Sequence, residues 1–212
     1  MTPKPPVGYT FATDLELGPL TGALFEYVVG SSFVYLRAER DVMLVLFPIS
    51  ECEIRGLKDP EPQFKFLLPP VPLRHLIAIL NQSREAARRK LEKLFYLCWD
   101  GSAWALEIPD QTQTEFSCEP LDSSEDSPHD RAIIEIHSHH EMEMETFFSD
   151  EDDSDEQGFR LYAVLGHVLS NPEIRLRLGC HGYYWYIPAG WVFDMPADLK
   201  DLHDSTAEGA RG

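Results

Sequence analysis

The sequence is poor in positive charge and holds no long apolar run. Its 212 residues carry 18 Lys and Arg against 36 Asp and Glu, a formal net charge of -18. An acidic surface repels the phosphate backbone, so this composition argues against nucleic-acid binding. No apolar stretch is long enough to span a bilayer, and the first residues lack the apolar core of a signal peptide. We therefore expect no membrane association and a cytoplasmic location.

Closely spaced cysteines are also missing. Cys52, Cys98, Cys118 and Cys180 are too scattered for a zinc ribbon or a thioredoxin-type redox motif. We expect all four to be reduced and buried. What the chain does have is a hydrophobic content of 43%, enough for a core, and a length that suits one ordinary domain with a smaller appendage.

The pattern of the chain changes near residue 70. The segment 1–70 is predicted to form a small β-rich domain with an antiparallel sheet, because short apolar runs occur at residues 25–29, 33–36, 42–47 and 64–68. Prolines between residues 59 and 72 break regular structure and favour a boundary there. Residues 71–200 are expected to form the main domain, and residues 201–212 a flexible tail.

The main domain mixes helical and strand patterns. Leu73, Leu76, Ile77 and Leu80 recur at the spacing of an amphipathic helix, with Pro72 suited to its first turn. Strands are predicted at residues 94–99, 104–108, 132–136, 159–168, 174–178 and 182–187, and a loop at residues 122–130. This order predicts an α+β fold, a mixed β-sheet flanked by helices.

Two histidines one residue apart follow the apolar run 132–136. Alternate side chains of a strand point to the same face, so His137 and His139 can converge on one point. Asp152, a short distance downstream, can add a carboxylate. Catalytic zinc takes three protein ligands of this kind and keeps a fourth position for water. The residues alone therefore indicate a hydrolytic zinc centre.

Simpler interpretations exist for parts of this pattern. Ser149, with Asp152 three residues later, is close to a helix capping box, and that role is compatible with catalysis. Asp153 is a rival to Asp152 as the third ligand. The rest of the acidic run 150–156 is expected to be solvated surface. Three isolated histidines are expected at the surface or hydrogen-bonded in the core, namely His129, His167 and His181.

The order His137, His139, Ser149, Asp152 resembles the signature of the JAMM or MPN-plus metallopeptidases, zinc isopeptidases of cytidine-deaminase-like fold that remove ubiquitin and its relatives. The resemblance implies that both histidines and Asp152 hold one Zn²⁺ per chain, and that Ser149 stabilises an oxyanion. In that family seven residues usually separate the second histidine from the serine. Here the spacer 140–148 has nine, which predicts a bulged loop.

The resemblance also implies a catalytic glutamate upstream, between the first helix and the next strand. Glu92 occupies that junction and is our candidate for the general base. Glu135 is the main rival, because strand parity places it on the same face as His137 and His139.

One bacterial branch of the family, the PRTRC system protein A group, is similar over residues 70–195. The matching stretches are 137–140, 147–149, 152–162 and 182–185. This branch is encoded beside ubiquitin-like and ubiquitin-activating-enzyme-like proteins. The resemblance implies hydrolysis of the bond after the carboxy-terminal tail of a ubiquitin-like protein, with activating- and conjugating-enzyme-like proteins as further partners. The alternative is a non-catalytic scaffold of the same fold that binds such partners.

Overall fold

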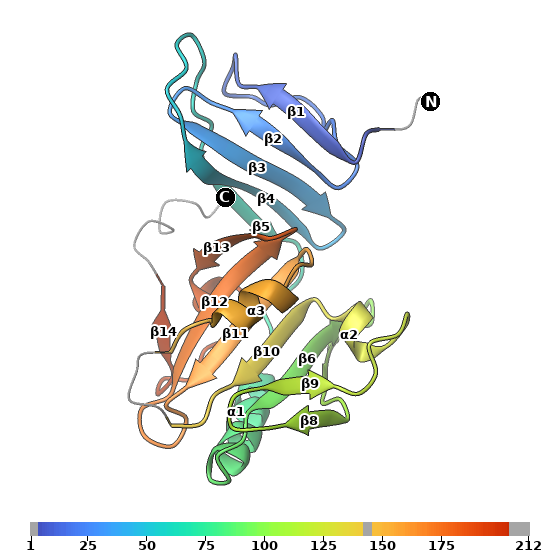
Figure 1. Cartoon of the computed structure of the whole chain (residues 1–212), viewed down its shortest axis with the longest axis vertical. Coiled ribbons are helices and arrows are strands. Elements are labelled where there is room, and N and C mark those ends of the chain that lie inside the picture. Colours follow the sequence, from blue (N-terminus) through green and yellow to red (C-terminus); the bar gives the residue numbers. More distant parts are fainter. Residues whose placement is uncertain (1–3, 142–145, 204–212) are drawn as a thin grey trace. The chain divides into compact units, whose positions relative to one another are not determined.

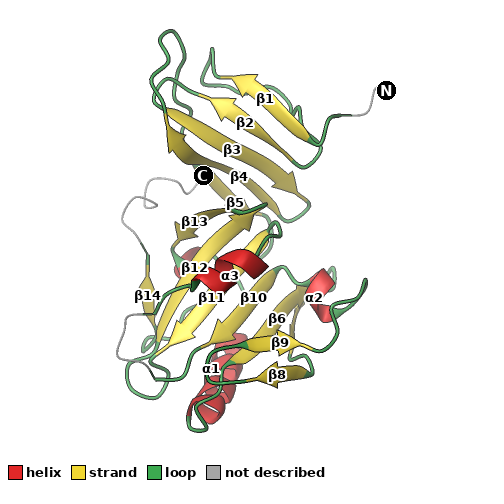
Figure 2. Cartoon of the chain, in the orientation of Figure 1, coloured by secondary structure: helices red, strands yellow, loops and turns green. Residues whose placement is uncertain are grey.

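The structure is a computed structural model that describes residues 4–141 and 146–203. The chain divides into two compact units, and the division falls between Pro69 and Pro70, within the proline-rich segment. Strands predominate over helices in a mixed α and β architecture (Figure 2), which confirms the α+β class at this level. None of the helices in the described stretches is long and apolar enough to cross a membrane.

The first unit is a five-stranded sheet in the order β1-β2-β3-β4-β5 (Figure 1). Its strands are β1 (Val7–Phe11), β2 (Phe25–Val29), β3 (Phe33–Arg40), β4 (Met43–Glu51) and β5 (Gln63–Phe66). Neighbours are antiparallel except β1, which runs parallel to β2. The expectation of a purely antiparallel sheet is therefore wrong at this edge. The long connection 12–24 lets the chain return before β2 begins, which a tight hairpin could not do.

A charged residue is buried in this first unit. Glu26 of β2 is fully buried. Its Oε2 accepts hydrogen bonds from the backbone N–H of Thr21 at 2.9 Å and from the hydroxyl of Thr10 at 3.1 Å. Its Oε1 pairs with Arg37 Nη1 at 2.9 Å. Burial alone would raise the pKa of this carboxyl. The hydrogen bonds from Thr21 and Thr10 and the charge of Arg37 outweigh that effect, so the net result is a lowered pKa. Glu26 is thus a buried anion with protein partners on both oxygens.

The second unit contains a seven-stranded sheet in the order β13-β12-β11-β10-β6-β7, with β14 added beside β12. Its elements are α1 (Leu73–Ala87), β6 (Lys93–Trp99), β7 (Trp104–Glu107), β8 (Gln111–Gln113), β9 (Cys118–Pro120), α2 (Pro128–Arg131), β10 (Ile134–Ser138), α3 (Asp150–Asp155), β11 (Arg160–Gly166), β12 (Glu173–Cys180), β13 (Tyr183–Ile187), the 3-10 helix η1 (Ala189–Trp191) and β14 (Lys200–Leu202). The sheet is mixed because β10 is parallel to β11 and antiparallel to β6.

Helix α1 and the histidines lie on opposite faces of this sheet. Lys93 reaches α1, since its Nζ donates to Gln82 Oε1 at 2.8 Å. The next residue, Leu94, points the other way and pairs with His137 in the register of β6 and β10. Pro72 precedes the first turn of α1, as expected from its fixed φ and missing N–H. The α1 face of the sheet is therefore structural, and the other face is available for a site.

Several local expectations for the chain need correction. The segment 122–130, expected to be loop, ends in α2, whose first N–H groups are capped by Ser127. Asp201 and Leu202, expected in a flexible tail, belong to β14 and pair with β12; residues 204–212 lie outside the described part. All four cysteines are free, but only Cys98 and Cys180 are buried, whereas Cys52 and Cys118 are half-buried.

Candidate metal centre

Strand β10 fixes both histidines at the middle of the sheet. His137 is flanked by Leu94 on β6 and Val164 on β11. His139 follows the strand directly, and its backbone N–H still donates to Leu165 O of β11 at 2.8 Å. The alternate residues Ile134 and Ile136 are fully buried. The apolar alternation of β10 thus anchors the strand and turns both imidazoles to the face opposite α1.

The two imidazoles converge with one carboxylate. His137 Nε2 lies 3.1 Å from His139 Nε2, and 3.6 Å from Asp152 Oδ1. One ligand atom from each of the three residues lies within 4.8 Å of the other two. Tetrahedral ligands about 2.0–2.1 Å from a zinc ion stand about 3.3 Å apart, a value between the two observed distances. These three residues form a group that could hold a metal ion.

The protonation states of the group suit a cation. Burial lowers the pKa of both histidines, and for His139 burial and the neighbouring His137 together lower it to about 3. Burial alone would raise the pKa of Asp152, but His137 and the hydrogen bonds from Ser149 outweigh it and the pKa is lowered. Near neutral pH the group is therefore two neutral imidazoles and a carboxylate, the donor set that zinc takes. The residues present fit the ion.

Asp152 owes its direction to the start of α3. The Ser149 hydroxyl and backbone N–H both donate to Asp152 Oδ2, at 2.8 and 2.6 Å, and the Asp152 N–H donates back to Ser149 Oγ at 3.2 Å. This is the capping box expected from the sequence. It leaves Oδ1 facing His137. Asp153 instead binds Arg177, so Asp152 is the one that joins the histidines.

Glu92 stands beside the ligand group. It lies just before β6, is buried, and its Oε1 is 3.7 Å from His139 Nε2. Its backbone is fixed by the β8–β9 hairpin, since its N–H donates to Thr114 O and its carbonyl accepts from Gln113. The structure therefore brings together every residue of the expected set: both histidines, Asp152, Ser149 and Glu92.

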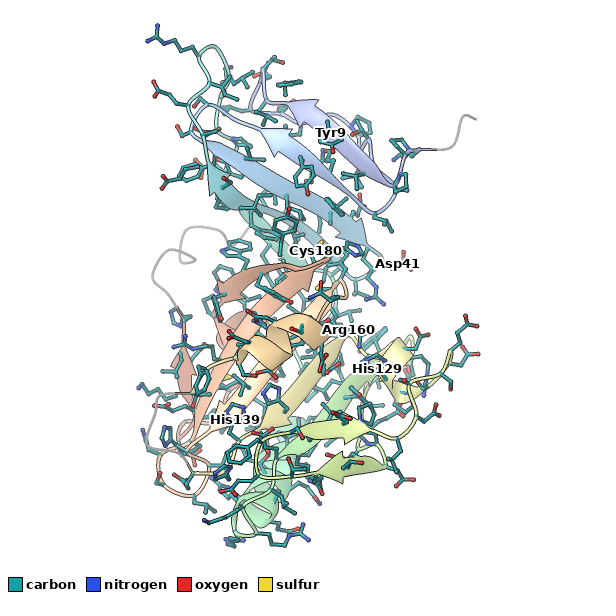
Figure 3. All side chains as sticks on the ribbon, viewed as in Figure 1. Tyr9, Asp41, His129, His139, Arg160 and Cys180 are labelled. Carbon is teal, nitrogen blue, oxygen red and sulfur yellow. The ribbon has the colours of Figure 1, made fainter. Side chains whose placement is uncertain are left out.

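The rival acid Glu135 has a different partner. Its Oε2 lies 3.3 Å from Arg160 Nη1, and burial raises its pKa to about 6 despite that positive charge. Arg160 begins β11, whereas His139 follows the far end of β10, and Figure 3 shows the two labelled side chains well separated along these strands. Glu135 thus belongs to the opposite end of the strand from His139.

A cavity of about 530 Å³ opens over the group. No Lys or Arg of the described residues lines it, and its carboxylates are Glu92, Glu119, Glu135, Asp152, Asp155 and Glu156. The acidic run after Ser149 was expected to be solvated surface, and this is wrong for Glu156, which is buried and paired with Arg177. The spacer 140–148 is described only at its ends, because residues 142–145 lie outside the described part.

Sequence reasoning missed the residues that surround the ligands. Phe148 lies edge-on to His137, and Phe147 edge-on to His139. Arg177 lies in the predicted strand 174–178 and was not a candidate site residue, but it is one of the most deeply buried side chains. The sequence signal that could have identified Arg177 was the acidic run 150–156, because an acid that becomes buried needs a cationic partner.

The other histidines are not part of the ligand group. His129 Nε2 lies 4.0 Å from Glu135, and His167 lies between Glu141 and Glu173. His181 begins the turn after β12. Among the described residues, only the group of His137, His139 and Asp152 meets the geometry of a metal site.

Comparison of the sequence with models of known protein families and with curated proteins found no match.

Proposed function

We propose that the protein is a zinc-dependent peptidase or isopeptidase of JAMM/MPN type that hydrolyses the bond after the tail of a ubiquitin-like protein. The observation that carries this proposal is the convergence of His137, His139 and Asp152 with Glu92 beside them. The substrate class comes from the sequence resemblance. The mixed sheet and the position of α1 before Glu92 are compatible with it.

Zinc held by the three ligands would supply a Lewis acid for the scissile carbonyl and would make a bound water easier to deprotonate. The protein side of the chemistry falls to Glu92. Its carboxylate, 3.7 Å from a ligand nitrogen, is placed to accept a proton from the attacking water and to pass it to the departing amine. Its burial limits exchange of that proton with bulk solvent.

Ser149 has two tasks in this proposal. In the resting geometry its hydroxyl hydrogen points to Asp152 Oδ2 and orients that ligand. To stabilise an oxyanion, the hydroxyl must turn away from Asp152 into the cavity that it lines. The backbone N–H of Ser149 would still hold Asp152 Oδ2 at 2.6 Å during that rotation. The carboxylate can therefore keep its direction while the hydroxyl serves the substrate.

The decisive experiment measures cleavage and metal content together. A ubiquitin-like protein with a reporter fused after its tail is incubated with the full chain, and zinc is quantified in the same preparation. We expect one zinc per chain and cleavage that a chelator abolishes and added zinc restores. Stoichiometric binding of the ubiquitin-like protein without any cleavage would instead identify the non-catalytic scaffold.

The assignment of the base is tested with isosteric variants. Glu92→Gln should abolish turnover while zinc remains bound, because the change removes the proton acceptor but not a ligand. Glu135→Gln should retain turnover, since Glu135 is paired with Arg160. Glu85→Gln is the matched control, an exposed glutamate on α1. An active Glu92→Gln variant would reject the assignment.

A further inference from the structure

Arg177 of β12 is buried in a place where a cation needs strong compensation. Only 1% of its side chain is exposed. Its Nε and Nη2 donate to Glu156 Oε2 at 2.9 and 2.6 Å, and its Nη1 pairs with Asp153 Oδ1 at 2.5 Å. One guanidinium therefore holds two carboxylates from the same short segment, a geometry that suits its planar fork of donors.

Two aromatic rings lie against this guanidinium. The ring of Phe148 lies 3.8 Å from Arg177 Cζ, and the ring of Tyr184 lies 3.9 Å from it. The Tyr184 hydroxyl is 2.8 Å from Asp153 O and 3.0 Å from Glu156 O. Phe148 is in turn edge-on to His137. Arg177 thus contacts both sides of the ligand set: α3 through its acids and His137 through Phe148.

Helix α3 depends on these contacts for its position. It has only six residues, too few to be stable by its own hydrogen bonds. The capping box turns Asp152 within α3, but it cannot fix α3 against the sheet, because both of its members lie in the same segment. Arg177 binds the residue directly after Asp152 and the residue that follows the last turn. It links α3 to the sheet that carries His137, alongside the Tyr184 hydroxyl of β13.

Two alternative roles fit less well. Arg177 does not line the cavity, so it is not placed to contact substrate. Stability alone is a weak reason for the arrangement, because apolar side chains usually stabilise a core as well as a buried ion pair does. What apolar side chains would not supply is a directional link to two points of α3.

We propose that Arg177 is a positioning residue of the metal centre: it holds α3 so that Asp152 Oδ1 meets the two imidazoles. The inference rests on the zinc-binding part of the proposed function. Loss of the guanidinium fork should therefore weaken zinc binding in the absence of any substrate. Outer residues of this kind typically contribute about 10- to 100-fold to metal affinity.

The test uses the full chain and the metal alone. Zinc affinity is measured by competition with a chromophoric chelator, and ligand geometry by the visible spectrum of the Co²⁺ form. Arg177→Lys keeps the charge but loses the fork, and it should weaken zinc binding about 10- to 100-fold and alter the Co²⁺ spectrum. Arg175→Lys is the matched control, because Arg175 lies two residues earlier on the same face and stacks on Tyr186. Its affinity and spectrum should be unchanged.

A second variant covers the case in which Arg177→Lys does not fold. Asp153→Asn changes a side chain that is 51% exposed and removes the negative charge of one of the two acids that Arg177 binds, so it should fold and weaken zinc binding severalfold. A folded Arg177→Lys protein with wild-type affinity and spectrum would overturn the proposal, as would an unchanged Asp153→Asn protein where Arg177→Lys is unfolded. Failure of the wild-type chain to cleave any substrate would reject the proposed hydrolysis and leave this result standing.

Discussion

Two buried glutamates, one in each unit, have opposite surroundings. Glu26 in the first sheet is bound on both oxygens by hydroxyl, amide and guanidinium donors. Glu92 in the second unit faces His139 Nε2 at 3.7 Å, within a cavity lined by other carboxylates. The protein itself supplies the donors that bind Glu26. Around Glu92, side chains that offer electron pairs are gathered at one point.

The difference separates a structural charge from one with a proposed function. A buried polar group whose partners are all supplied by the protein adds stability and order. A cluster of electron-pair donors in one cavity stays costly until a cation arrives, and then the binding free energy stabilises the folded state. Burial of a carboxylate by itself therefore does not indicate a site; the character of the atoms around it does.

The largest expected effect comes from removing a ligand. His139→Ala should weaken zinc binding by about a thousandfold, about 4 kcal/mol, because the site falls from three protein ligands to two. Zinc should then no longer raise the melting temperature of the second unit. All four tryptophans (Trp99, Trp104, Trp185 and Trp191) lie in that unit, so their fluorescence follows it directly.

The adjacent histidine provides the control for that variant. His140 is also buried, but its Nε2 lies 3.6 Å from Glu115 and it is outside the ligand group. His140→Ala should therefore retain zinc affinity within about tenfold. Equal losses in the two variants would contradict the assigned ligand set.

The same substitution in the two glutamates should give opposite results. Glu26→Gln removes the charge that compensates Arg37, and it should lower the free energy of unfolding of the first unit by about 3 kcal/mol, with zinc affinity unchanged. Glu92→Gln should change the stability of the metal-free protein by less than about 1 kcal/mol, yet abolish turnover. Hydrogen exchange of peptides from each unit, followed by mass spectrometry, measures the two changes in stability. Turnover is measured by cleavage of the reporter fusion.

The metal-free second unit should lose stability in mild acid. The pKa of His139 is lowered from 6.5 to about 3 by burial and by His137, so the unfolded chain binds a proton that the folded chain does not over this range. Stability therefore falls as pH drops below 6.5, by about 2 kcal/mol at pH 5 for this one group, and the loss levels off near pH 3. Urea titrations followed by tryptophan fluorescence should show this slope, and His139→Gln should reduce it.

The first unit should respond only to stronger acid. Asp59 accepts bonds from Ser31 Oγ at 2.6 Å and from the N–H of Ser32 at 2.9 Å. Burial alone would raise the pKa of Asp59, but these hydrogen bonds outweigh that effect and lower the pKa to about 2. Its contribution is therefore present above pH 3.8 and is lost as pH falls through about 2. Because the group is half exposed, Asp59→Asn should cost only about 1 kcal/mol at neutral pH, measured by hydrogen exchange of residues 25–51.

The local sequence pattern was sufficient to predict the candidate ligand residues, but not the residues that surround them. Alternation along β10 placed both histidines on one face, and the spacing of Ser149 and Asp152 gave the capping box that orients the third ligand. Both follow from the geometry of a single element, so the sequence contains them. Glu92 came from resemblance and not from any local rule.

Features that depend on contacts between elements could not be predicted. Arg177 alternates with apolar neighbours as an exposed position would, and it is buried by the acids of the α3 segment and the rings of Phe148 and Tyr184. The parallel pairing of β1 with β2 and the choice of Asp152 over Asp153 are likewise set by where distant segments meet. Periodicity reports which face a side chain takes, and it does not report what covers that face.

The two ends of the spacer between His139 and Ser149 are held separately, one by the connection between β11 and β12 and the other by the first residue of β12. Glu141 accepts bonds from the N–H of Leu169 and the hydroxyl of Ser170, and Thr146 donates to Glu173. The positions of His139 and Ser149 are thus tied to two anchor points, and in general a longer connection between fixed ends costs little beyond loop-closure entropy, about 0.6 kcal/mol for a doubling in length.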